Sequence, residues 1–175
     1  MKSALLVIDY QNSIFIDPPA YQATMVLERI QILIDRARNA RLSIIYVQHE
    51  QAGSSWQAGC ETWQFPDRIA PRSGDFVSPK KCSSAFQDST LQAHLAEHRV
   101  QKIFVCGYAT EFCIDTNVRH AASLKLETVV ISDAHTTRDR PHLAAHKIIE
   151  HHNWVWSELG SIRLCQSDSV QFGDD

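Results

Sequence analysis

The feature that most constrains the fold is the apolar run at residues 4–9 (ALLVID), in which only the last residue is charged. A nearly continuous apolar run of this length predicts a strand buried on both faces, as in parallel sheets. Similar runs recur at residues 43–48 (SIIYVQ), 102–106 (KIFVC) and 128–132 (TVVIS). Weaker strands are expected at residues 76–79 and 161–164.

Helical patterns separate these runs. Residues 22–40 place Val26, Ile30, Leu33, Ala37 and Ala40 on one apolar stripe. Ser89 or Thr90 is expected to cap a helix that carries Leu91 and Leu95, and residues 110–124 form another helix. Asp139 is expected to cap a last helix, with Pro141 near its first turn, that runs to about residue 152.

This alternation predicts an α/β fold, a doubly wound and mostly parallel sheet with helices on both faces. Nothing in the sequence marks a linker or repeat, so we expect one domain over residues 1–175. Right-handed crossovers bring all the strand carboxyl ends to one edge of the sheet, where ligands bind.

Five chemically useful positions follow the strands that reach this edge. They are Asp9, His49, Lys80, the segment 107–113 and Asp133. An acid, an amine and the thiol of Cys113 are therefore expected on one rim, although they are far apart in sequence.

Cys113 and Cys106 are predicted to lie in different surroundings. Cys106 lies inside a strand and is expected in the core, whereas Cys113 falls in the first helical turn if Thr110 is the N-cap. Unpaired N–H groups, the helix dipole and Lys80 would then lower the thiol pKa toward neutrality. Asp9 is the candidate general base, and the same N–H groups could hold an oxyanion.

Composition excludes several other classes. The five cysteines contain no C-x-x-C pair, so neither a disulfide framework nor a zinc ribbon is indicated. The net charge of −3, without basic clusters, argues against nucleic-acid or membrane partners. The short apolar start does not resemble a signal peptide, and no run approaches the ~18 residues of a membrane helix. We therefore expect a cytoplasmic protein. The helical spacing of four late histidines indicates a solvated helix face. They are His142, His146, His151 and His152.

Five motifs in order resemble the isochorismatase-like cysteine hydrolases, which include nicotinamidases and N-carbamoyl amide hydrolases. They are "ALLVIDYQNSIF", "YVQHE", "KKCSSAF", "GYATEFCIDTNVRHAA" and "VVISDAHTT", and they cover nearly the whole chain. The resemblance implies a Rossmann-like three-layer fold, a small-molecule substrate, no cofactor and a homo-oligomer.

The resemblance also implies a triad of Asp9, Lys80 and Cys113. Lys80 is preferred over Lys81 because the family pattern places three residues between its lysine and Ser-Ala-Phe, which here is residues 84–86. It further implies a cis peptide between Tyr108 and Ala109 that directs the N–H groups of Ala109 and Cys113 into an oxyanion hole.

The substrate is not named by the sequence. Gln48-His49-Glu50 departs from the Asp-x-His metal site of nicotinamidases, so no metal is expected. The presence of Cys113 favours amide, carbamoyl or related acyl hydrolysis over vinyl-ether hydrolysis, which remains an alternative. A non-catalytic or redox thiol protein is a second alternative, and an FMN-binding protein is disfavoured by the absence of a phosphate loop.

The long loop at residues 50–75 suggests a binding element. Candidate substrate contacts are Phe15, His49, Trp56, Trp63, Tyr108 and Phe112.

Overall fold

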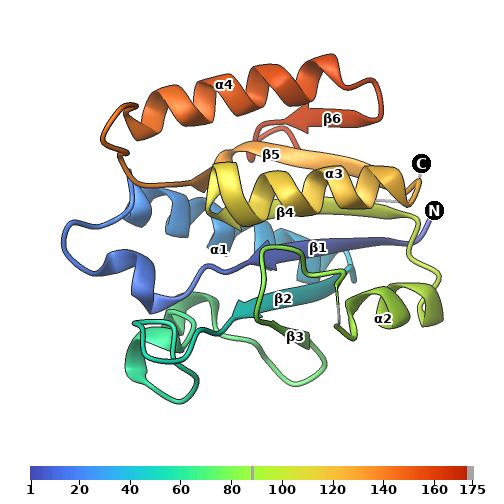
Figure 1. Cartoon of the computed structure of the whole chain (residues 1–175). Coiled ribbons are helices and arrows are strands. Elements are labelled where there is room, and N and C mark those ends of the chain that lie inside the picture. The colour runs from blue at the N-terminus through green and yellow to red at the C-terminus, as the bar shows by residue number, and fades with distance from the viewer. Residues whose placement is uncertain (88, 173–175) are drawn as a thin grey trace.

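The computed structural model describes residues 1–87 and 89–172. Within them, six strands form one parallel sheet in the order β3-β2-β1-β4-β5-β6, as Figure 1 shows. This arrangement confirms the predicted doubly wound α/β class. The strands are β1 (Ser3–Ile8), β2 (Ser43–His49), β3 (Phe76–Lys80), β4 (Lys102–Tyr108), β5 (Glu127–Thr136) and β6 (Ile162–Cys165).

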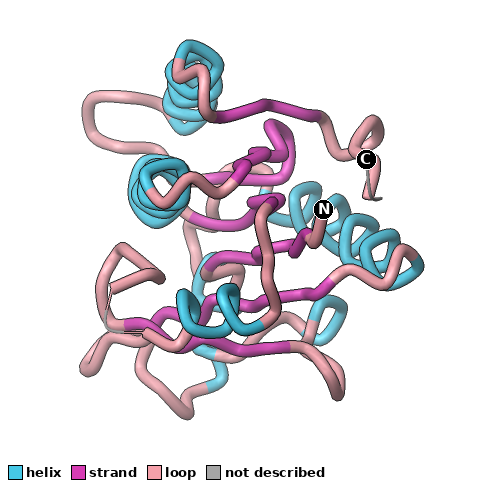
Figure 2. The backbone as a smooth tube through the Cα atoms, turned by 90° about the vertical axis from the view of Figure 1, so that its right-hand side faces the viewer, coloured by secondary structure: helices cyan, strands magenta, loops and turns pink. Residues whose placement is uncertain are grey.

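Helices cover both faces of the sheet, which Figure 2 shows end-on. Leu5 and Val7 of β1 pack in the core on the side of α1, and Leu6 and Ile8 pack in the core on the side of α2 and α3. The apolar run that begins the chain is therefore buried on both faces, as predicted. The helices are α1 (Ala23–Asn39), α2 (Leu91–Glu97), α3 (Asp115–Ser123) and α4 (Ala145–Glu158). No helix in the described part of the chain has both the length and the apolar character needed to span a bilayer.

The largest difference from the predicted strands is in β5. This strand continues past residue 132 to Thr136, and its register with β4 shifts between Val105 and Gly107. Asp133 therefore lies within the strand, and its placement on the rim after the strand is wrong. Its carboxylate accepts hydrogen bonds from the Ser167 N–H and hydroxyl and pairs with Arg29 at 3.3 Å, which is a structural role.

The helix predicted to follow Asp139 begins later and ends later than expected. Pro141 lies in a turn that precedes α4, and the Asp139 carboxylate accepts a hydrogen bond from the N–H of Ala145, the first helical residue, at 2.8 Å. The prediction that Asp139 is the N-cap is therefore wrong, because the N-cap is Ala144, although Asp139 still hydrogen-bonds the helix start from six residues away. The helix then continues past His152, which is half-buried beside Trp156.

The loop at residues 50–75 is anchored to the α1 face. It contains two short 3-10 turns, η2 (Glu61–Trp63) and η3 (Asp67–Ile69). Phe65 and Ile69 are buried in the core cluster that contains α1. The loop is therefore held in place by apolar contacts although it has no long regular element.

The carboxyl ends of the two central strands leave no room for a side chain at Gly107. Ile8 pairs with Gly107, and a Cβ atom built on Gly107 would lie 2.0 Å from the Ile8 carbonyl oxygen. Gly107 also has a φ of +131°, which side chains rarely adopt. Asp9, the residue that follows β1, has a φ of 51°. This is a left-handed conformation that Asp tolerates better than most residues. Glycine at position 107 is thus required to bring the two central strand ends together.

We expect Gly107→Ala to destabilise the protein by about 3 kcal/mol or more, because its Cβ would meet backbone atoms that cannot move aside. The measurement is the urea midpoint of unfolding. Gly160→Ala is the matched control, since nothing lies within 4 Å of a Cβ built on that exposed glycine. Equal midpoints for the two variants would contradict the close approach.

Candidate active site

The predicted acid, amine and thiol meet at the carboxyl edge of the sheet. Lys80 Nζ lies 2.7 Å from Asp9 Oδ2 and donates a hydrogen bond to Cys113 Sγ at 3.2 Å. Asp9 and Lys80 are 2% and 4% exposed, so their ion pair is shielded from water. Cys113 is half-buried. One ammonium group therefore joins a carboxylate and a thiol that are contributed by different parts of the chain.

The Lys80 ammonium has two further acceptors. Nζ donates to the Cys82 carbonyl at 3.0 Å and lies 3.3 Å from His49 Nδ1. Burial alone would lower the pKa of Lys80, but the negative charge of Asp9, the charge that Cys113 carries once it ionises, and the hydrogen bonds to both groups raise it above its usual value. Lys80 is therefore a permanent cation at neutral pH. The adjacent Lys81, in contrast, is exposed and pairs with Glu50, in line with the preference for Lys80 over Lys81.

Cys113 lies in a single wide π-helical turn, Thr110–Ile114, immediately before α3. The predicted role of Thr110 as an N-cap is wrong, because its hydroxyl instead hydrogen-bonds His135 Nδ1 at 2.9 Å. The turn is closed by the Ala109 carbonyl, which accepts from the N–H groups of Phe112 and Ile114. The peptide between Tyr108 and Ala109 is cis, as the family resemblance implied.

The predicted lowering of the Cys113 pKa is also wrong. Burial, followed by the negative charge of Asp9, raises the pKa of Cys113 to about 12, and the opposing effect of Lys80 is smaller. At neutral pH the resting group is a thiol. Asp9 Oδ1 is buried and has no hydrogen-bond partner among the described residues, so it is an open acceptor beside that thiol.

The candidate substrate contacts separate into two groups. Trp56 stacks on Tyr108 with ring centroids 6.0 Å apart and meets His49 edge-on at 5.7 Å, which forms an aromatic wall next to Lys80. Phe112 is 52% exposed, and the Arg140 guanidinium lies 5.0 Å from its ring centroid. These side chains are therefore available at the rim.

The other two candidates, Phe15 and Trp63, make contacts that belong to the packing of the fold. Phe15, in the short turn η1 (Asn12–Phe15), packs edge-on against Tyr10 at 6.2 Å. The Trp63 carbonyl accepts hydrogen bonds from the side-chain amides of Gln11 and Gln48. Among the described residues, no ring contact joins Phe15 or Trp63 to the aromatic wall, and both are better explained by their local packing.

Gln11 is a supporting residue that the sequence reasoning missed. Its carboxamide oxygen accepts from the His49 N–H at 2.8 Å, and its nitrogen donates to the carbonyls of His49 and Trp63. It is completely buried. A polar side chain three residues after the buried strand β1 is the signal that could have identified it, because a buried polar group needs partners.

Asn117 is the second residue missed. Its nitrogen donates to the carbonyls of Cys113 at 2.7 Å and Ser83 at 2.9 Å, and its oxygen accepts from the Ala85 N–H at 2.6 Å. This side chain therefore fastens the turn that carries Cys113 to the segment that follows Lys80. An Asn inside a predicted helix is a weak signal for such a role, because Asn forms helices poorly.

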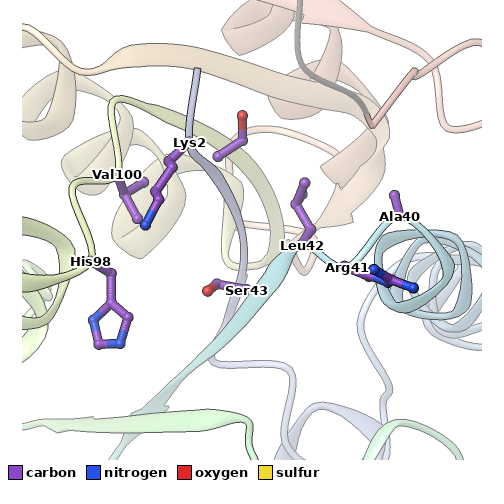
Figure 3. A pocket seen from close by; sticks show the side chains of 8 residues that line it. Lys2, Ala40, Arg41, Leu42, Ser43, His98 and Val100 are labelled. Carbon is purple, nitrogen blue, oxygen red and sulfur yellow. The ribbon is translucent and has the colours of Figure 1, made fainter.

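Two hollows in the surface lie at opposite ends of the sheet. One, of about 510 Å³, lies beside Lys80. It is lined by Glu50, Pro79, Lys80, Lys81, Cys82 and Gln87. The other, of about 430 Å³, lies at the amino ends of the strands and is shown in Figure 3, where Lys2, Ser43 and His98 are among its lining residues. Only the first is next to the reactive groups.

No metal site or disulfide is found within the described residues. No group of three His, Cys, Asp or Glu side chains there is arranged to hold a metal ion. All five cysteines are described, and each is a free thiol. Cys106 is completely buried, which confirms its predicted place in the core.

Comparison with known proteins identifies the family. The parallel α/β sheet of this chain is the fold of isochorismatase-family hydrolases. The isochorismatase domain matches residues 3–157, so the chain belongs to the isochorismatase family.

Individual relatives extend the comparison. A crystal structure of an isochorismatase family protein is 31% identical, with a TM-score of 0.88 over 94% of this chain and 98% of the other. Streptothricin hydrolase of Streptomyces noursei is 31% identical over 79% of this chain and 51% of its own length. The chain thus spans about half the length of that relative. Ureidoacrylate amidohydrolase RutB of Stutzerimonas stutzeri is 23% identical over 95% of this chain and 82% of its own.

We expect Asn117→Ala to destabilise the protein by about 2–4 kcal/mol, because it leaves two carbonyls and one N–H buried without partners and opens a void. Urea unfolding measures the change. Asn39→Ala, at the exposed end of α1, is the matched control and should change stability by less than about 0.5 kcal/mol. A small effect at position 117 would show that the three hydrogen bonds do not support the fold.

Proposed function

We propose that the protein is a cysteine-dependent hydrolase of a small amide, carbamoyl or related acyl compound, which acts through a thioester on Cys113. The observation that carries the proposal is the buried ammonium of Lys80, which contacts both Asp9 and Cys113. The second oxygen of Asp9 is left without a partner and can accept a proton. A buried base and thiol in reach of one cation are the components of nucleophilic catalysis.

The first half-reaction forms the thioester. Because the pKa of Cys113 is raised, the thiol keeps its proton until a substrate carbonyl arrives. Asp9 takes that proton as the sulfur attacks the carbonyl carbon, and Lys80 stabilises the developing thiolate. Protonated Asp9 then donates the proton to the leaving nitrogen, the C–N bond breaks, and an amine or ammonia leaves.

The second half-reaction restores the thiol. Asp9 is again a carboxylate and removes a proton from a water molecule, which attacks the thioester carbonyl. The C–S bond breaks, the proton returns to the sulfur, and the carboxylic or carbamic acid is released. In both halves we propose that the N–H groups of Ala109 and Cys113 hold the negative oxygen of the tetrahedral intermediate.

Two relatives support the choice of bond. The name of RutB describes an amidohydrolase acting on ureidoacrylate, and the other curated relative is named a hydrolase of streptothricin. The first name fits a thiol that attacks an amide carbonyl carbon, and the second fits a hydrolase. The aromatic wall of Trp56, Tyr108 and His49, with Phe112 at the rim, is the proposed boundary of the acyl pocket. Vinyl-ether hydrolysis and a non-catalytic thiol are the outcomes that the experiments below would reveal instead.

Cys113→Ala is expected to abolish turnover, because within the described residues Cys113 is the thiol that hydrogen-bonds Lys80. The assay is ammonia or amine release across a panel of small amides and carbamoyl compounds, with mass spectrometry to detect an acylated Cys113 peptide. Cys165→Ala, a half-buried thiol in β6, should retain wild-type rates. Full turnover in the Cys113 variant would refute the mechanism, and no release from any amide by wild type would favour the alternatives.

Replacing Lys80 and Lys81 separately gives a matched pair at neighbouring positions. Lys80→Met is expected to lower kcat at least ~10²-fold, because the thiolate and Asp9 lose their shared cation. Lys81→Met removes only an exposed pair with Glu50 and should change kcat less than about twofold. Circular dichroism checks that both variants fold, and equal rates in the two variants would exclude the proposed role of Lys80.

A further inference from the structure

The ammonium of Lys80 has more acceptors than protons. Asp9 Oδ2, the Cys82 carbonyl, Cys113 Sγ and His49 Nδ1 all lie within 3.3 Å of Nζ. A lysine ammonium carries three N–H bonds. Asp9 and the Cys82 carbonyl are the two nearest partners, so the third N–H is shared between Cys113 and His49.

The state of Cys113 decides which of these two acceptors is the stronger. A neutral thiol is a weak acceptor, and so is the sulfur of a thioester, whereas a thiolate is a charged and strong one. A neutral imidazole nitrogen is an acceptor of intermediate strength. The third N–H therefore favours His49 when Cys113 is protonated or acylated, and Cys113 when it is a thiolate.

The position of His49 suits this role. Because Lys80 can only donate, Nδ1 must be the unprotonated ring nitrogen, and the ring proton lies on Nε2. Gln11 holds the His49 backbone through both its N–H and its carbonyl, and Trp56 packs against the ring. The acceptor nitrogen is thus fixed beside Nζ.

We propose that His49 is a positioning residue that acts through Lys80. Its Nδ1 holds the third Lys80 proton in the thiol and thioester states and gives it up to Cys113 in the thiolate state. The proton stays on Lys80 throughout, and only the hydrogen bond changes partner. The proposal assigns His49 a role in the reaction proposed above and rests on that reaction.

The charges around His49 allow the imidazole to remain neutral. Lys80 on β3 and Asp9 after β1 face it, and Glu50, paired with Lys81, follows it in the chain. Burial and the Lys80 charge lower the pKa of His49 below its usual value, and Asp9 and Glu50 oppose this effect less strongly. Above its pKa, His49 keeps Nδ1 open as an acceptor.

The test compares His49→Asn with His49→Gln. The shorter Asn side chain can place its carboxamide oxygen near the position of Nδ1, whereas Gln reaches toward Nε2. The measurement is the pH dependence of Cys113 alkylation by iodoacetamide, followed by mass spectrometry of the Cys113 peptide. The rates are compared between about pH 7 and pH 9, where the thiolate fraction rises with pH, and a second neutral reagent, N-ethylmaleimide, checks for changed access.

Loss of the competing acceptor should favour the thiolate. His49→Gln is therefore expected to lower the apparent Cys113 pKa by about one unit, which is a ~tenfold faster alkylation below that pKa. His49→Asn should stay within about twofold of wild type. An unchanged or raised pKa in the Gln variant, or the same shift in both variants, would overturn the proposal.

A second measurement uses wild-type protein and is independent of variant folding. The imidazole ¹⁵N shifts of His49 should report an unprotonated Nδ1 and a protonated Nε2 at pH 7.5. A proton on Nδ1 would overturn the proposal. Neither experiment requires substrate turnover, so failure of the hydrolase assignment and failure of this role for His49 are distinguishable.

Discussion

The buried ammonium of Lys80 is the interaction on which the site depends. Removing a charged pair from water costs several kcal/mol, and the cost is offset only where the geometry supplies enough partners. Asp9, the Cys82 carbonyl, Cys113 and His49 provide those partners from four separate segments. A change that moves Asp9 or the Cys82 carbonyl leaves the buried ammonium with too few partners. The carboxyl edge must therefore be built accurately for the chain to be stable as well as active.

The sheet meets this requirement at its centre, where the strand order reverses between β1 and β4. In doubly wound sheets this reversal leaves a crevice in which ligands bind. Asp9 leaves β1 there in a left-handed conformation, and Gly107 lets β4 approach the Ile8 carbonyl. The close contact sets the spacing between Asp9 and the turn that carries Cys113. Backbone packing thus controls the geometry of the reactive groups.

Buried polar side chains hold the surrounding loops to this frame. Gln11 joins the end of β2 to the long loop, Asn117 joins the Cys113 turn to the segment after β3, and His135 holds Thr110. Each such group would be costly if left unpaired, so each favours one arrangement of the backbone over its alternatives. Rigidity of this kind is what a site needs when a single N–H is to change partners without movement of the lysine. The two proposals, hydrolysis at Cys113 and control of Lys80 by His49, both use this rigid frame.

The sequence by itself determined the layer architecture and the residues at the rim. Apolar runs such as residues 4–9 specify strands buried on both faces, and parallel crossovers then place Asp9, Lys80 and Cys113 at one edge. Only the tertiary structure decided the ionisation of Cys113 and the place of Asp133. The thiol pKa depends on the balance of burial and two nearby charges, and a helix position alone predicted the wrong direction. A shift in strand register moved Asp133 off the rim, because pairing between distant segments, which local sequence does not encode, sets where a strand ends.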